Sequence, residues 1–237
     1  MILTRCAITL ILLALSSAGA AAERRYSITD FDKIRVVGAS RVIIETGRAT
    51  TVRSSGDRDA LDLLSVESLD RTLTIEPVGG TVATDARALA KPTTIYITLP
   101  LLSTAKLNGS GTILIASLRG IQADVSLTGS GQISVAKVMA DNLNARLSGS
   151  GTLTLAGKAL KVDANIKGSG SVAASSLNVA DLKLTAASSG TIGMFASRSA
   201  MVTATGSGTV AINGGPSCTV QNIGVGVVTC GKAPLTK

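Results

Sequence analysis

The chain has 237 residues, of which 45% are hydrophobic and 2% are aromatic, and its formal net charge at pH 7 is +8. It contains no histidine, which excludes Ser-His-Asp and Cys-His nucleophilic schemes, histidine general bases and histidine-containing zinc sites. The basic residues form no cluster, and the aromatic residues are too few to build a stacking platform for bases. We therefore expect no nucleic-acid partner.

The first 22 residues have the pattern of a secretory signal peptide. Arg5 precedes an apolar run from Ala7 to Leu15, and small residues at positions 18–22 offer cleavage sites after Ala20 or Ala22. The apolar run is too short to span a bilayer. We therefore expect an exported protein, in the periplasm or at the cell surface, with no integral membrane segment after signal removal and one domain over residues 23–237.

Residues 23–104 contain a weak form of the repeat that is regular after residue 104, in which alternating apolar residues flank a triplet of small residues. Gly38-Ala39-Ser40 is flanked on both sides by alternating apolar residues, and Leu73–Ile75 and Thr94–Leu99 are further strand candidates. The segment Asp57–Leu69 suits a short helix or a wide loop. We interpret residues 23–104 as irregular coils of a larger solenoid, with a separate small β domain before residue 90 as the alternative.

A Gly-Ser-Gly triplet recurs between residues 105 and 212. The triplets lie at 109–111, 129–131, 149–151, 168–170 and 206–208, with Ser-Ser-Gly at 188–190, and their first residues are 20, 20, 19, 20 and 18 positions apart. Such a period is typical of a solenoid whose coils gain a core only by stacking. The sequence therefore predicts an all-β solenoid with coils of about 20 residues.

Apolar residues alternate with polar ones on both sides of each triplet. The positions four and two before its first residue, and four and six after it, are aliphatic in almost every coil, as at Val125, Leu127, Ile133 and Val135. This period of two predicts two strands facing one interior, with the triplet as the corner between them. We expect the following glycines to form corners rather than a ligand loop: Gly109, Gly111, Gly129, Gly131, Gly149, Gly151, Gly168, Gly170, Gly190, Gly206 and Gly208.

Two cysteines follow the signal peptide, Cys218 and Cys230. An even pair in an exported chain favours a disulfide over two free thiols. We expect this disulfide to hold residues 213–237 as the C-terminal cap of the solenoid.

One polar column contains carboxylates. Five positions before the triplet lie Asp124, Asn144 and Asp163, followed by Lys183. Strands spaced about 4.8 Å apart would separate the two carboxylates by roughly 9.6 Å, near the upper range for an inverting glycosidase pair. A weak site for a hard cation is a second alternative. We interpret the column as a solvated polar stripe and expect no metal and no cofactor.

The chain resembles a known family in three segments. Phe31–Val36, the strand Ile95–Pro100 and the succeeding Gly-Ser-Gly coils are similar to the DUF2807 family, named for an auto-transporter adhesin head (GIN) domain, over about residues 31–212. The resemblance implies a right-handed parallel β-helix, similar in shape to pectin lyases but without their catalytic residues. It also implies a role in adhesion.

These observations together favour a non-enzymatic exported protein that presents a polar surface for adhesion or cell-envelope binding. The expected partner is an envelope or extracellular glycan or protein. The alternative is a polysaccharide lyase or hydrolase that acts on an acidic glycan through Asp124 and Asp163.

Overall fold

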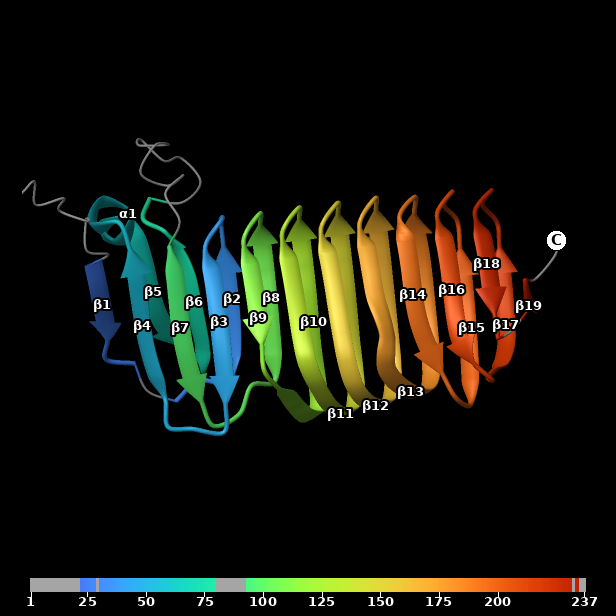
Figure 1. The fold of residues 1–237 in the computed structure, drawn as a ribbon, viewed down its shortest axis with the longest axis horizontal. Helices are drawn as coiled ribbons and strands as arrows, with labels where there is room; N and C mark the ends of the chain where they lie inside the picture. The colour runs from blue at the N-terminus through green and yellow to red at the C-terminus, as the bar shows by residue number, and fades with distance from the viewer. Residues whose placement is uncertain (1–21, 29, 80–92, 232, 235–237) are drawn as a thin grey trace, which may run out of the picture.

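The computed structural model describes residues 22–28, 30–79, 93–231 and 233–234. Most of these residues lie in strands that stack into one long solenoid, with its first strands at the left of Figure 1 and its last at the right. The fold class expected from the sequence, an all-β parallel β-helix with coils of about 20 residues, is confirmed. The expected signal peptide lies outside the described residues except for Ala22.

Each regular coil has two faces, joined by a glycine corner at one end and a bend at the other. The first face stacks β8 (Thr104–Gly109), the later parts of β10 (Leu118–Gly129), β11 (Gln132–Gly149), β12 (Thr152–Gly168) and β13 (Ser171–Ser188), then β15 (Ser199–Ala204) and β17 (Ser217–Asn222). The second face stacks β9 (Thr112–Ile115), the early parts of β11, β12 and β13, then β14 (Thr191–Ala196), β16 (Thr209–Gly214) and β18 (Val227–Cys230). The two-residue β19 (Ala233–Pro234) pairs antiparallel with β18.

The aliphatic columns lie in register inside the solenoid. Leu127 is the strand partner of both Leu107 and Leu147, and all three side chains are buried. Ile133 has the same relation to Ile113 and Leu153 on the second face. Each coil thus gains its core from the coils on either side of it, because one layer alone would leave these residues in water.

The glycine corners stack too closely to admit side chains. Gly129 has φ of +114°, a conformation that L side chains rarely adopt. A Cβ on Gly131 would lie 2.5 Å from the carbonyl oxygen of Gly111 in the preceding coil. The amide of Gly131 donates to the carbonyl oxygen of Gly109 at 3.0 Å, so the corner continues the backbone ladder between coils.

The N-terminal strands are stacked out of sequence order. β2 (Lys33–Val37) and β3 (Arg41–Thr46) form a coil that lies between β8 and β9 on one side and β6 (Thr72–Pro77) and β7 (Thr94–Leu99) on the other. All of these pairings are parallel, so residues 33–46 and the segments 72–77 and 94–99 belong to the same stack as the regular coils.

Antiparallel strands close the N-terminal end. β4 (Thr51–Gly56) pairs antiparallel with β7, β1 (Ala22–Tyr26) with β4, and β5 (Leu64–Leu69) with β6. Between β4 and β5 lies α1 (Arg58–Asp62), which is capped by the Asp57 carboxylate and buries Ala60 and Leu61. Of the two structures expected for Asp57–Leu69, the short helix is present in the first half. The second half, Leu64–Leu69, is the strand β5, which was not expected.

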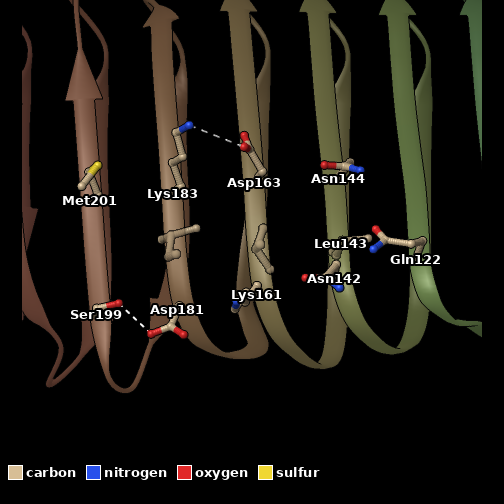
Figure 2. A pocket seen from close by; sticks show the side chains of 12 residues that line it. Gln122, Asn142, Leu143, Asn144, Lys161, Asp163, Asp181, Lys183, Ser199 and Met201 are labelled. Carbon is tan, nitrogen blue, oxygen red and sulfur yellow. Dashed lines mark hydrogen bonds and ion pairs between the residues drawn. The ribbon is translucent and has the colours of Figure 1, made fainter.

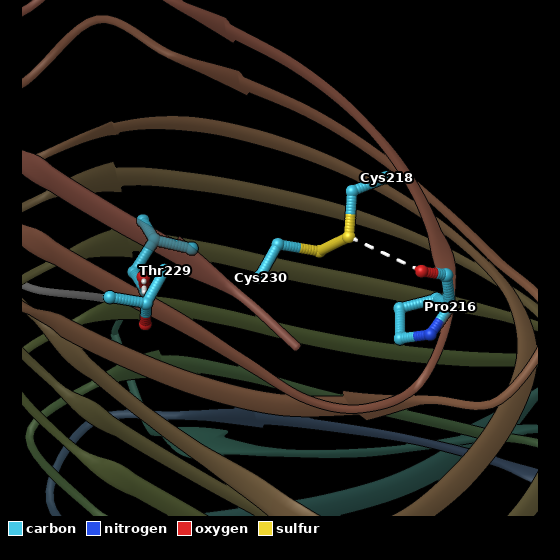
Figure 3. Close-up of a disulfide and its surroundings, with 5 residues drawn as sticks. Pro216, Cys218, Thr229 and Cys230 are labelled. Atoms are coloured by element: carbon cyan, nitrogen blue, oxygen red, sulfur yellow. Dashed lines mark hydrogen bonds between the residues drawn. A yellow bond between two sulfur atoms is a disulfide. The ribbon is translucent and has the colours of Figure 1, made fainter. Parts of the chain in front are cut away.

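The C-terminal coil is joined across its interior by the expected disulfide. Cys218 on β17 is bonded to Cys230 on β18, with 6.4 Å between the two Cα atoms (Figure 3). The bond therefore links the two faces of the last coil and occupies the place that aliphatic side chains fill in the coils before it.

Candidate binding groove

A groove crosses the first face over four to five coils of the regular stack (Figure 2). One row of outward side chains comes from the position seven residues before each corner, where Gln122, Asn142, Lys161, Asp181 and Ser199 are strand partners. The second row comes from two residues further along each strand, where Asn144, Asp163, Lys183 and Met201 are partners. We call the space between these rows the polar groove; its volume is about 480 Å³.

The floor of the polar groove is the sheet itself. Leu143, Val162 and Leu182 line it, yet their side chains are at most 3% exposed because they point into the core. Alternation along each strand therefore raises two rows of outward side chains, polar except for Met201, above a backbone floor. Within a row the side chains repeat at the strand spacing of about 4.8 Å.

Asp181 is the most constrained acid of the polar groove. It accepts hydrogen bonds from Arg198 Nε at 2.8 Å and Ser199 Oγ at 2.7 Å, and a further bond from Arg198 Nη2. These two partners, Arg198 first, hold the pKa of Asp181 well below its usual range. The same contact raises the pKa of Arg198. Asp181 is thus a fixed carboxylate and is not suited to act as a general acid near neutral pH.

The predicted stripe is one register column, but its members have different roles. Asp124, Asn144 and Asp163 are consecutive strand partners. Asn144 and Asp163 line the polar groove, and Asp163 lies 3.8 Å from the ammonium of Lys183. Asp124 lies beyond the groove lining, where its Oδ2 accepts a hydrogen bond from Arg146 at 2.8 Å. Its buried Oδ1 has no hydrogen-bond partner among the described residues.

The whole first row was missed by the sequence interpretation: Gln122, Asn142, Lys161, Asp181 and Ser199. The signal was present, because the position seven before the corner is polar in every coil from Gln122 to Ser199. It differs in chemical type from coil to coil, so only the register reveals it as one row.

The polar groove is lined by several kinds of hydrogen-bonding group. It contains amide, ammonium, hydroxyl and carboxylate groups, and each of its two carboxylates already has a cationic partner. Within the described ranges no group of three or more His, Cys, Asp or Glu side chains is placed to hold a metal ion. The same ranges contain no helix of the length and hydropathy needed to cross a membrane.

Comparison with known proteins places this chain among adhesin-like β-helices. The family model described as "Putative auto-transporter adhesin, head GIN domain" (DUF2807) matches residues 30–216. A search of the curated proteins gave no match.

Several crystal structures are similar to the chain. A "putative adhesin" from Bacteroides fragilis is 22% identical with a TM-score of 0.80, covering 89% of this chain and 97% of the other. A "putative adhesin" from Parabacteroides distasonis is 21% identical with a TM-score of 0.68, covering 89% of this chain and 97% of the other. A "putative lipid binding protein" from the same organism is 20% identical with a TM-score of 0.66, covering 89% of this chain and 96% of the other. At these identities the likeness supports the fold.

Proposed function

We propose that this chain, which belongs to the DUF2807 family, is an exported, non-enzymatic β-helix protein. It binds a glycan of the cell envelope or of an extracellular surface, and the binding site is the polar groove. The observation that carries this proposal is the pair of outward rows, polar except for Met201, that flank one continuous floor over successive coils. An extended glycan presents hydroxyl groups at regular intervals, and rows of amide and ammonium groups can bond to them repeatedly.

The charge of the polar groove favours a ligand without a strong net charge. Lys161 and Lys183 are balanced by Asp163 and Asp181, so the four charged side chains of the lining cancel. Since rings for stacking are absent from the lining, affinity must come from many hydrogen bonds of modest strength. We therefore expect weak binding to a single glycan unit and stronger binding to long chains.

Binding to an array of bacterial envelope polysaccharides and mucin-type glycans tests the proposal. Asn142→Ala and Lys161→Ala should each weaken binding by about tenfold, as expected for the loss of a hydrogen bond worth about 1.4 kcal/mol. Lys167→Ala is the matched control, because Lys167 is an exposed lysine on the same strand outside the groove. Equal loss in all three variants, or wild-type protein that binds no glycan, would overturn the proposal.

The enzymatic alternative can be followed in the same samples. Chromatography of the glycans after incubation would reveal shortened chains if the protein cleaved them. Cleavage that is abolished by Asp124→Asn and Asp163→Asn would replace the binding proposal with a hydrolase or lyase that uses those carboxylates.

We further propose that residues 1–22 direct export, to the periplasm or the cell surface. The disulfide in the last coil supports an oxidising compartment, where such bonds persist. Treatment of intact cells with external protease separates the two locations. Loss of the protein supports surface display, whereas protection supports the periplasm.

A further inference from the structure

The last coil differs from the others in its outward residues. Its corner, Gly224-Val225-Gly226, stacks on Gly206–Gly208, and the amide of Gly226 donates to the carbonyl oxygen of Gly206 at 3.1 Å. The middle residue of the six earlier triplets is serine in every case: Ser110, Ser130, Ser150, Ser169, Ser189 and Ser207. In the last coil it is Val225, which is 83% exposed.

Two neighbouring outward positions change in the same way. Ile223, 66% exposed, takes the place that Thr205 has in the coil before it, and Val227, 55% exposed, takes the place of Thr209. Three adjacent positions that are polar in the preceding coil are therefore large and apolar in the last coil. We call Ile223, Val225 and Val227 the terminal apolar tip. Water-exposed β-branched side chains side by side at one site are typical of a contact surface.

The coil also lacks charge and leaves a strand edge open. No Asp, Glu, Lys or Arg occurs from Ser199 to Gly231. β17 pairs with β15 on one side, and on its other side no strand of the described residues pairs with it. Charged residues are a common protection of exposed strand edges, and this edge has none of them.

The core of the last coil is incompletely covered on the β17 side. Cys218, Val220 and Asn222 point inward but are only half-buried, whereas their partners Ala200, Val202 and Ala204 in the preceding coil are 1%, 0% and 5% exposed. The side-chain amide of Asn222 donates to the carbonyl oxygen of Gly226 at 2.9 Å, and within the part of the chain that the structure describes its buried Oδ1 has no hydrogen-bond partner. The end of the stack thus leaves part of the inward side chains of β17 accessible.

The opposite end of the solenoid is closed in another manner. Antiparallel β1 and β5 form its outer strands, and β1 carries Glu23, Arg24 and Arg25. Arg24 forms an ion pair with Asp62 of α1. A charged, capped end does not match the uncharged edge of β17, so end-to-end contact between unlike ends is disfavoured.

From these features we propose that the C-terminal end of the solenoid docks a second copy of this chain, C-terminal end to C-terminal end. A twofold axis across the contact places the two β17 strands side by side and antiparallel, so each supplies the other's missing strand partner. A second copy has the same cross-section as the end it covers, and residues 199–231 of neither copy bring a charged side chain to the contact. The proposal is independent of the polar groove.

The size of the end predicts a weak dimer. A six-residue strand is about 20 Å long and the two faces lie about 10 Å apart, so each copy buries a few hundred Å² at most. Stable interfaces bury about 800 Å² per partner. We therefore expect association that depends strongly on protein concentration.

Sedimentation velocity of the oxidised chain, without its signal peptide, over roughly a hundredfold range of concentration tests the proposal. Wild-type protein should shift from monomer to dimer and no further. A triple variant, Ile223→Thr, Val225→Ser and Val227→Thr, places the residues of the preceding coil in the tip and should weaken dimerisation at least about tenfold. Thr219→Lys with Gln221→Lys charges the edge of β17 and should have the same effect.

Leu160→Thr is the control, since Leu160 is an exposed apolar residue of β12 far from the last coil, and it should dimerise as wild type. Unchanged melting temperatures would show that the variants fold. Wild-type protein that stays monomeric at every concentration, variants that dimerise as wild type, or growth into filaments would each overturn the proposal. So would monomers that co-sediment with phosphatidylcholine vesicles through the tip, because they would assign it to a membrane surface.

Discussion

At the scale of single residues, the pairing of Asp181 with Arg198 and Ser199 is the contact with the clearest chemical consequence. Because the folded-state pKa of Asp181 is lowered, its ionised form stabilises the fold above the unfolded pKa of about 3.9, and this contribution is lost as the pH falls through the folded value. Asp181→Asn should therefore lower the free energy of unfolding at pH 7, and the difference from wild type should shrink below about pH 4.

Urea unfolding at a series of pH values measures this difference. The pair is at the surface, so raising the salt concentration should reduce the effect at pH 7 as well. Arg198→Gln is the matched variant, and it should reproduce the loss at neutral pH because it removes the same contact. A difference that stays constant from pH 7 to pH 2 would show that Asp181 acts through packing rather than through its charge.

The residues of the polar groove show what the sequence could reveal at this scale. The column of Asp124, Asn144 and Asp163 was found because carboxylates recur at one repeat position, and the strand register agrees with that alignment. Asp181 and Lys161 escaped notice because their row has no common chemistry. Whether a polar column lines a groove depends on the side chains of the neighbouring strands and on the shape of the bend that precedes them. The repeat period of the sequence describes neither.

At the scale of the strand, the core keeps its volume because large and small side chains exchange places between neighbouring coils. In β11 and β12 the two inward positions before the corner are Ala145 with Leu147 and Ala164 with Ile166, whereas in β13 the order is reversed, with Leu184 before Ala186. All of these side chains are buried. Total volume is thus retained while the position of the bulk moves, which a packed core requires.

This exchange predicts non-additive effects of substitution. Leu184→Ala leaves two alanines together and should destabilise the protein by about 2–5 kcal/mol, since a cavity forms. The double variant Leu184→Ala with Ala186→Leu restores the order of the two preceding strands and should recover a large part of that loss. Chemical denaturation of the two variants measures the coupling. A double variant less stable than Leu184→Ala would show that the position of the bulk, not its amount, is what this layer requires.

The strands also divide into those that sequence could and could not predict. The strands of the regular coils could be predicted from their aliphatic columns, because aliphatic residues at the same repeat position are strand partners in neighbouring coils. Strands β2, β3, β6 and β7 were also indicated by their apolar residues. The order in which β2 and β3 enter between β6–β7 and β8–β9 was not, since it depends on long-range pairing. A strand pattern alone carries no information on its neighbour.

At the scale of the whole molecule, each coil contacts only its neighbours, so stability is distributed along one axis. The N-terminal end is closed by antiparallel strands and α1, while the last coil depends on the Cys218–Cys230 bond for closure. In the chain-entropy account a disulfide that closes a loop of this length stabilises by about 3 kcal/mol. That stabilisation acts locally, because the bond connects only β17 to β18.

Reduction of the disulfide should therefore open the end of the stack before its middle. We expect amide hydrogen exchange of reduced protein to accelerate strongly in β17 and β18, weakly in β15 and β16, and hardly at all in β11 and β12. Cys218→Ser with Cys230→Ser should give the same profile without reductant, and thiol titration of exported wild-type protein should find no free thiol. The measurement belongs at a protein concentration low enough for monomers, since an end-to-end partner would itself protect β17. Uniform acceleration along the chain would mean instead that the solenoid unfolds as one cooperative unit, and that the bond stabilises all of its coils together.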